Sequence, residues 1–216
     1  MTKEEFLEEL AKLGIYPTKK QLDQLNQFYK LLIEWNQKLN LTRILTEEEV
    51  YLKHFYDSLT IAKVVNLNQI HTLCDVGTGA GFPGIVLKIM FPHLKITLLD
   101  ALQKRVNYLN EIINQLNLNQ IVALHIRGED YSETFDIVTS RAVANIEKLV
   151  TYTMHLTNEN GKMIAMKGDI DKELTNDVKA KLSKKYDVLQ IEKFDLPKDQ
   201  GKRSLIVIKN KIKKDM

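Results

Sequence analysis

Short apolar runs alternate with segments of helical periodicity from residue 70 to residue 210, and this alternation constrains the fold more than any other feature. The runs have the length and apolar character of strands buried in a parallel sheet. Regular strand–helix alternation predicts a doubly wound α/β architecture. We expect strands at 70–76, 96–100, 121–126, 135–139, 161–167, 188–196 and 205–209, with helices at 83–90, 103–116, 146–156 and 172–185.

The last two expected strands are separated only by a loop of proline, glycine and charged residues. That loop is too short for a helical crossover, so the two strands should pair as an antiparallel hairpin. The prediction is a mostly parallel seven-stranded sheet that ends in an antiparallel pair. A dinucleotide dehydrogenase domain has no need of this ending, whereas Rossmann-like class I S-adenosylmethionine-dependent methyltransferases usually have it.

The first 65 residues are predicted to be helical throughout. Capping boxes begin at Thr2 and at Thr18, each ahead of an amphipathic run, and Thr46 opens a third helical stretch. A segment without strands cannot supply the first strand of the sheet. We therefore divide the chain into an N-terminal helical segment, 1–65, packed on the core, and a Rossmann-like domain, 66–216.

Composition excludes several classes of protein. Cys74 is the only cysteine, so no internal disulfide forms, and the five histidines lack the spacing of a zinc site. No metal is expected. The chain begins with acidic residues where a signal peptide is basic, and the longest stretch free of charged residues, 112–126, is too short and polar to span a bilayer. We expect a cytoplasmic protein.

The net charge of +3 is concentrated near the C-terminus, where residues 161–216 carry 15 basic and 9 acidic side chains. Such a basic segment suits a polyanionic partner. A solvated lysine-rich helix face followed by a basic tail accounts for the same distribution. Charge alone favours this simpler explanation.

The segment from Asp75 to Gly84 carries the chemistry. Glycines at 77, 79 and 81 let the backbone turn sharply and approach a ligand closely. The pyrophosphate-binding pattern Gly-x-Gly-x-x-Gly, counted from Gly77, would place its third glycine where the chain has Phe82. Asp75 would repel a pyrophosphate but can hold an amine, such as the ammonium group of S-adenosylmethionine. Spacing and charge therefore favour S-adenosylmethionine over a dinucleotide.

Polar residues also follow the next strands. Asp100 ends the second strand, where an acid accepts hydrogen bonds from a ribose, as it does for either cofactor. Gly128 and Glu129 follow the third strand, where adenine contacts occur, although an ordinary loop explains them equally well. Arg141 follows the fourth strand at the reaction crevice. Since a charged head group is rarely buried without a partner, packing explains Arg141 poorly.

The acceptor of the methyl group is constrained by what is missing. No Asp/Asn-Pro-Pro-Tyr/Phe clamp for exocyclic amines and no cysteine follows the fourth strand, and Cys74 is better explained as a buried apolar residue. Guanine N7 needs neither feature because it carries no proton, so that alignment is the main requirement. Cations that can contact RNA phosphates fall at strand ends or in the loops after them: Lys104, Arg105, Arg127, Arg141, Lys167 and Arg203.

These motifs together resemble a known family, the bacterial 16S rRNA guanine-N7 methyltransferases of the RsmG type, also called glucose-inhibited division protein B. The resemblance covers nearly the whole chain. The glycine loop alone is generic, but its combination with the segments 54–58 and 140–144 is specific. The matching pieces are Trp35-Asn36, Asn40-Leu41-Thr42, Lys53 to Ser58, Asp75 to Gly84, Leu99-Asp100, Lys104-Arg105-Val106, Arg127, Glu129, Ser140 to Ala144, Lys167-Gly168 and Arg203.

The resemblance implies methylation of N7 of guanine 527, in the 530 loop of 16S rRNA, with S-adenosylmethionine as cofactor. It implies that Gly77, Phe82, Gly128, Glu129 and Arg141 contact the cofactor, together with Asp75, Gly79 and Asp100. Arg141 lies near both substrates and is the candidate catalytic residue. Lys104, Arg105, Arg127, Lys167 and Arg203 would bind RNA. Gly128 departs from the family, which commonly has a larger apolar residue before the acid.

Two other functions remain open at this stage. One is a small-molecule methyltransferase of the same fold, and the other is an RNA-binding protein without catalytic activity. The expected partner is 16S rRNA or the small ribosomal subunit, and we expect a monomer that does not bind membranes. For His54, Asp57 and Ser58, a structural joint between the N-terminal helices and the sheet is favoured over a role in the crevice.

Overall fold

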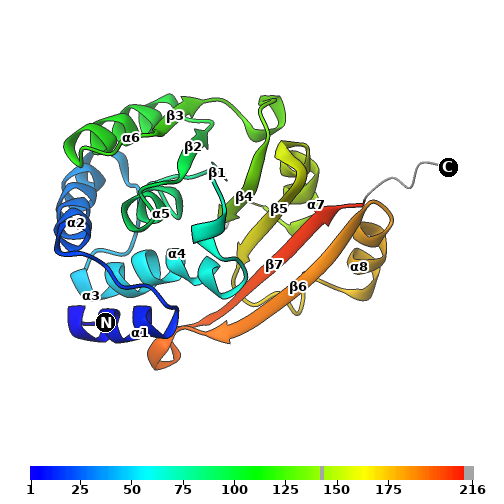
Figure 1. Ribbon diagram of the computed structural model, residues 1–216, viewed down its shortest axis with the longest axis horizontal. Helices are drawn as coiled ribbons and strands as arrows, with labels where there is room; N and C mark the ends of the chain where they lie inside the picture. The colour runs from blue at the N-terminus through cyan, green and yellow to red at the C-terminus, as the bar shows by residue number, and fades with distance from the viewer. Residues whose placement is uncertain (142–143, 212–216) are drawn as a thin grey trace.

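The computed structural model describes residues 1–141 and 144–211, and its centre is one seven-stranded sheet (Figure 1). The order across the sheet is β3-β2-β1-β4-β5-β7-β6. The first five strands are parallel, and β7 runs antiparallel between β5 and β6. This confirms the predicted fold class, terminal hairpin included. The strands are β1 (Thr72–Val76), β2 (Lys95–Asp100), β3 (Ile121–His125), β4 (Phe135–Arg141), β5 (Thr157–Lys167), β6 (Tyr186–Asp195) and β7 (Lys202–Asn210).

Side chains that alternate along the strands separate the core into two layers. On β4, Ile137 joins a cluster formed with the N-terminal helices, α5 and α6, while its neighbour Val138 joins a cluster formed with α7 and α8. Figure 1 shows the same division, with α7 and α8 on one side of the sheet and the other helices on the opposite side. The helices after residue 83 are α5 (Gly84–Met90), α6 (Gln103–Gln115), α7 (Ile146–Thr153) and α8 (Asn176–Ser183), with short 3₁₀ turns at Gly128–Asp130, Met154–Leu156 and Pro197–Asp199.

The N-terminal helices begin where the capping residues predict. Thr2 and Thr18 form complete capping boxes, and the Thr46 side chain accepts a hydrogen bond from the Glu49 amide. The helices in this segment are α1 (Lys3–Lys12), α2 (Lys19–Leu39) and α3 (Glu47–Val50). The segment after Thr46 was predicted to be helical in two stretches, 46–55 and 57–65, and it is helical but irregular. After α3 the chain forms a π-helical turn (Tyr51–Tyr56), the short helix α4 (Asp57–Leu59) and 3₁₀ turns (Thr60–Lys63 and Leu67–Gln69).

The N-terminal segment shares its hydrophobic cluster with the sheet. Phe28 of α2 lies 5.3 Å from the ring of Phe82, and Gln24 donates to the carbonyl of Leu116 at 2.8 Å. The proposed division at residue 65 stays a prediction, and these contacts show that residues on both sides of it are packed together.

Two element boundaries differ from expectation. Helix α8 begins at Asn176 rather than at residue 172, because Thr175 caps it through the amide of Val178. Strand β5 begins at Thr157 rather than at residue 161, because Thr157 pairs with Phe135 before a β-bulge shifts the register. Within the described residues, no helix is both long enough and apolar enough to cross a membrane.

Candidate functional site: a glycine turn beside a cationic pocket

The turn after β1 has the backbone that its glycines predict. Gly77, Gly79 and Gly81 have positive φ angles of 70°, 60° and 93°, a region that side chains disfavour. At Gly81 a Cβ atom would also lie 2.5 Å from Cδ1 of Ile85. Among the described residues, the space in front of Gly79 is open, since a Cβ there would have only the Gly77 carbonyl oxygen within 4.0 Å. The turn therefore presents bare backbone to an open space.

Asp75 lies beneath this turn and is fully buried. Its Oδ2 accepts hydrogen bonds from the hydroxyl of Thr78 at 2.7 Å and from the amide of Gly84 at 2.8 Å. Its Oδ1 is buried without a hydrogen-bond partner among the described residues. Burial raises the pKa of Asp75 to about 6. Its observed contacts hold the turn together, while the predicted contact with a cofactor ammonium group stays a prediction.

Asp100 lies on the opposite side of the turn, at the end of β2. Its Oδ2 accepts the amide of Gly79 at 3.0 Å and lies 3.5 Å from Nη1 of Arg105, while Oδ1 accepts the amide of Leu102 at 2.9 Å. A carboxylate accepts about four hydrogen bonds, so capacity remains for a ligand. Asp100 therefore lies directly beside the open space at Gly79, and its contact with a ribose stays a prediction.

The loop after β3 closes against the end of β1. A Cβ on Gly128 would lie 2.7 Å from Cγ1 of Val76, so glycine allows this approach and accounts for the departure at this position. Arg127 and Glu129 project from the loop as a loose, exposed pair with 3.8 Å between their charged atoms. Their contacts with adenine or RNA stay predictions.

Phe82 contributes to the site by a route that its sequence position does not reveal. Its ring is buried and stacks on His54 with 4.3 Å between centroids and 11° between planes. The guanidinium carbon of Arg141 lies 5.1 Å from the same ring. The ring therefore links the glycine turn to the N-terminal segment and to the end of β4, and any cofactor contact at Phe82 falls to its backbone.

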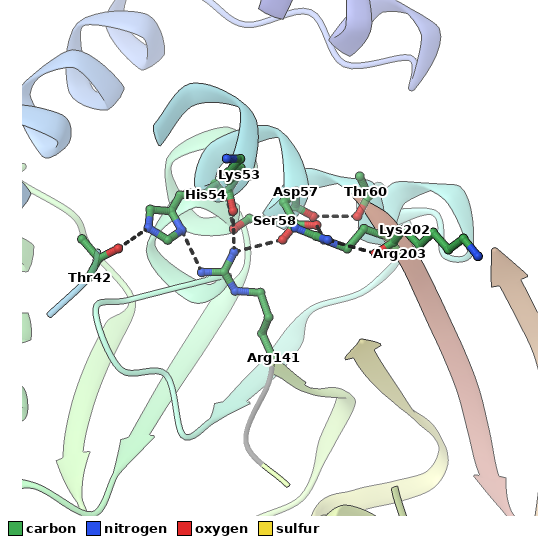
Figure 2. A network of polar contacts seen from close by, with 9 residues as sticks. All are labelled: Thr42, Lys53, His54, Asp57, Ser58, Thr60, Arg141, Lys202 and Arg203. Atoms are coloured by element: carbon green, nitrogen blue, oxygen red, sulfur yellow. Dashed lines mark hydrogen bonds and ion pairs between the residues drawn. The ribbon is translucent and has the colours of Figure 1, made fainter. Parts of the chain in front are cut away.

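Arg141 is held by the N-terminal helical segment (Figure 2). Its Nη1 donates to the carbonyl oxygen of Lys53 and to Oδ2 of Asp57, both at 3.1 Å, and its Nη2 lies 3.1 Å from Nδ1 of His54. Arg203 approaches the same carboxylate, with Nε 2.9 Å from Oδ1 of Asp57. The charged head of Arg141 thus has the partner that its position demands, and that partner also binds a second arginine.

His54 is neutral in this arrangement. Because the Arg141 guanidinium only donates, Nδ1 of His54 must accept, and the proton is on Nε2, which donates to Oγ1 of Thr42 at 2.9 Å. Burial and the adjacent Arg141 charge lower the pKa of His54 to about 3. The Ser58 hydroxyl, in α4, instead donates to the carbonyl oxygen of His54 in the preceding π-helical turn. These contacts are those of a structural joint, although His54 and Asp57 also face a pocket.

That pocket has a volume of about 350 Å³ and lies where β4, β5 and β7 meet the π-helical turn. Its polar wall contains Lys53, Asp57, Arg141, Lys167 and Arg203, and its apolar wall contains Ile44, Met166 and Leu205. We call it the cationic pocket. Sequence reasoning found its arginines and Lys167 but assigned no role to Ile44 or Met166, because nothing in their spacing places them beside an arginine.

The predicted RNA-binding residues fall into two groups. Lys104, Arg105 and Arg127 lie at the ends of β2 and β3, near Asp100, where Lys104 is exposed. Lys167 and Arg203 lie across the sheet at the cationic pocket, where Lys167 bonds Glu173 at 2.9 Å. The expected single basic edge is therefore divided, with the glycine turn and Arg141 between its parts.

Ala142 and Val143 of the motif around Arg141 lie outside the described residues. In the described part of the chain, no three His, Cys, Asp or Glu residues are grouped to hold a metal.

Comparison with known proteins identifies the family. The sequence profile of the family described as rRNA small subunit methyltransferase G matches residues 21–206. The chain belongs to this family. Ribosomal RNA small subunit methyltransferase G of Bacillus subtilis is 42% identical over 97% of this chain and 90% of that protein. The protein of the same name from Staphylococcus haemolyticus is 43% identical over 93% and 86%, respectively. The family resemblance predicted from the motifs is confirmed.

Solved structures with low sequence identity confirm the fold. Precorrin-6y C5,15-methyltransferase from Geobacter metallireducens superposes with a TM-score of 0.57 at 15% identity, covering 79% of this chain and 92% of that one. Ribosomal protein L11 methylase from Lactobacillus delbrueckii subsp. bulgaricus gives 0.54 at 16% identity, covering 72% and 77%. The rRNA small subunit methyltransferase G family thus shares the class I methyltransferase fold with enzymes of other substrates.

Proposed function

We propose that this chain transfers a methyl group from S-adenosylmethionine to N7 of guanine 527 in the 530 loop of 16S rRNA, acting as a cytoplasmic monomer. Membership of the rRNA small subunit methyltransferase G family supports rRNA as the substrate. The observation that carries the proposal is the position of Arg141. Its guanidinium lies over the ring of Phe82, which follows the glycine turn, and it also lines the cationic pocket. One residue thereby joins a cofactor cradle to a substrate pocket.

The residues present fit the proposed cofactor. The open space at Gly79 admits a ligand that a side chain would displace, and Asp100 beside it has capacity to accept hydrogen bonds from ribose hydroxyls. Asp75 has a buried oxygen without a partner among the described residues, which suits a nearby ammonium group. When bound, S-adenosylmethionine supplies an electrophilic methyl group on a sulfonium.

Arg141 is the residue proposed to orient the guanine. A guanidinium has five N–H donors, and three of them bond Lys53, Asp57 and His54. Two N–H groups are therefore left without a partner among residues 1–141 and 144–211. A hydrogen bond from one of them to guanine O6 would fix the base. The lone pair on N7 then stays free to accept the methyl group. Since N7 carries no proton, the protein supplies alignment and electrostatic stabilisation rather than a base.

The deciding experiment compares small-subunit RNA from cells with and without the protein. Nucleoside mass spectrometry should detect 7-methylguanosine at the 530 loop only when the protein is present, and purified protein with S-adenosylmethionine should restore it in vitro. Methylation of a different atom would correct the acceptor. Unchanged RNA together with tight binding of S-adenosylhomocysteine would favour a small-molecule methyltransferase, and RNA binding without S-adenosylhomocysteine binding would favour a non-catalytic role.

A further inference from the structure

We propose that the cationic pocket receives the target nucleotide itself. Its base would be extruded from the folded RNA and would lie between Ile44 and the side chains of Met166 and Leu205, and its phosphate would contact Arg203. This inference rests on the proposed function, which names the acceptor but not where it binds. Three features of the pocket support it, namely its charge, its apolar wall and its position relative to the glycine turn.

The charge of the pocket matches one phosphodiester. Lys53 bonds Glu49 and Lys167 bonds Glu173, each at 2.9 Å, so both lysines are neutralised by carboxylates of their own. The two arginines instead share the single carboxylate of Asp57. One positive charge therefore remains unbalanced, and a phosphodiester carries one negative charge.

Arg203 is the cation best placed to meet that phosphate. Its Nε donates a hydrogen bond to Asp57, and its Nη1 donates one to the carbonyl oxygen of Lys202, both at 2.9 Å. The exposed fraction of its side chain is 24%, equal to that of Lys53, whose charge Glu49 balances. It is 18% for Arg141 and 8% for Lys167. Because Asp57 fixes the guanidinium while its outer edge reaches solvent, Arg203 is oriented before any ligand arrives, which lowers the entropic cost of binding.

The apolar wall offers surfaces on which a base can stack. Met166 and Leu205 are buried cross-strand neighbours on β5 and β7 and form a floor, and Ile44 approaches from the loop after α2. The volume of about 350 Å³ falls at the lower end of the usual range for small-molecule sites. A base that remains stacked in folded RNA cannot enter a pocket of this kind, so the nucleotide must be extruded, as in other enzymes that modify bases.

The position of the pocket places such a base beside the methyl donor. Arg141 and His54 form the wall shared with the glycine turn, since both contact the ring of Phe82. A guanine held here has its O6 and N7 edge directed at that wall when O6 accepts from Arg141. The pocket therefore accounts for the choice of N7, and Asp57 acts as a positioning residue for both arginines.

Filling the pocket tests the inference without changing its charge. Ile44→Trp should occupy the space for the base, and Leu45→Trp is the matched control because Leu45 is exposed and does not line the pocket. The substrate is a hairpin RNA with the sequence of the 530 loop, and a second copy carries 2-aminopurine at the target position. We expect wild type and Leu45→Trp to raise 2-aminopurine fluorescence and to methylate the guanine RNA. Ile44→Trp should do neither, with kcat/KM lowered by about 100-fold or more.

Calorimetry with S-adenosylhomocysteine tests whether Ile44→Trp is folded, and the dissociation constant of this ligand should stay within about twofold of the wild-type value.

The charge is tested separately by comparing Arg203→Gln with Lys202→Gln, because Lys202 is a neighbour whose side chain is exposed. Arg203→Gln should reduce the salt dependence of RNA affinity by about one phosphate contact, and Lys202→Gln should not. Methylation by Ile44→Trp at the wild-type rate, or a fluorescence rise in that variant, overturns the pocket assignment. Failure of the wild-type protein to methylate any RNA refutes the proposed function instead.

Discussion

Asp57 and Arg141 lie 84 residues apart in sequence, yet Oδ2 of Asp57 accepts a hydrogen bond from Nη1 of Arg141 at 3.1 Å (Figure 2). The contact joins the N-terminal helical segment to the end of β4. It fixes a residue that the glycine turn and the cationic pocket share. The N-terminal segment is therefore part of the candidate site and not only a support for the sheet.

Replacing Asp57 with Asn should destabilise the protein strongly. The amide nitrogen of Asn is a donor, so it opposes the donors of one arginine and leaves two guanidiniums without a counter-charge. Removing one partner of a buried ion pair costs about 3–5 kcal/mol. We expect a loss of about 3 kcal/mol or more in urea unfolding, together with loss of methylation.

The matched control for this substitution is Asp171→Asn, which removes an exposed ion pair with Lys193. Exposed pairs contribute up to about 1 kcal/mol, so this variant should stay close to wild type. Equal destabilisation of the two variants would show that the shared carboxylate has no special role in the fold.

The features of the fold that arise from local pattern were predictable. Alternation of apolar runs identified every strand, and the capping residues at Thr2 and Thr18 located two helices to within a residue or two. The glycine turn was predictable as well, because positive φ angles at 77, 79 and 81 are a local property of the backbone.

What the sequence could not supply were contacts between distant segments. Asp57 and Arg203 are 146 residues apart, and no spacing rule connects them. The π-helical turn at Tyr51–Tyr56 was also missed, since its apolar pattern is that of an ordinary helix. This turn bears on the candidate site, because the Lys53 carbonyl within it accepts a hydrogen bond from Arg141.

Gly79→Val is expected to abolish cofactor binding. A branched side chain would project into the open space in front of the turn and would also be strained at a φ of 60°. Calorimetry with S-adenosylhomocysteine should detect no binding. Gly14→Val separates the two effects, because Gly14 also has a positive φ and open surroundings but lies at the end of α1. It should lose comparable stability and keep the wild-type dissociation constant.

Asp100→Ala should raise the dissociation constant of S-adenosylhomocysteine about tenfold or more, the equivalent of one or two charge-assisted hydrogen bonds. Part of this loss arises because the amide of Gly79 loses its acceptor. Asp136→Ala is the control, since Asp136 also accepts backbone amides but does so at the start of β1, through His71 and Thr72. An unaltered dissociation constant in Asp100→Ala would remove this residue from the cofactor site.

Lys104→Ala should weaken RNA binding without affecting the cofactor. Lys104 is exposed at the start of α6, shortly after β2 ends at Asp100. If RNA extends across both groups of cations, the slope of log affinity against log salt should fall by about one contact. Lys30→Ala removes an exposed charge on α2 that belongs to neither group and should leave the slope unchanged. Identical methylation by Lys104→Ala at every salt concentration would favour a small-molecule substrate.

The buried, neutral His54 should make the protein sensitive to acid. Its pKa is about 3 in the folded state, against an ordinary value of 6.5, so between these pH values the unfolded chain binds a proton that the folded chain does not. The free energy of unfolding contributed by this group is therefore complete above pH 6.5 and falls as the pH drops toward 3. The slope approaches about 1.4 kcal/mol per pH unit for one proton.

His54→Asn isolates this contribution, because the side-chain oxygen of Asn can accept from Arg141 where Nδ1 does, yet it does not titrate. Urea unfolding of both proteins between pH 7 and pH 4 should show the wild type losing stability faster than the variant. Parallel curves would mean that the pKa of His54 is the same in the folded and unfolded states, so that the folded protein takes up this proton as the pH falls through about 6.5. In that case Nδ1 would no longer accept from Arg141, and the arrangement of donors around that arginine would have to be revised.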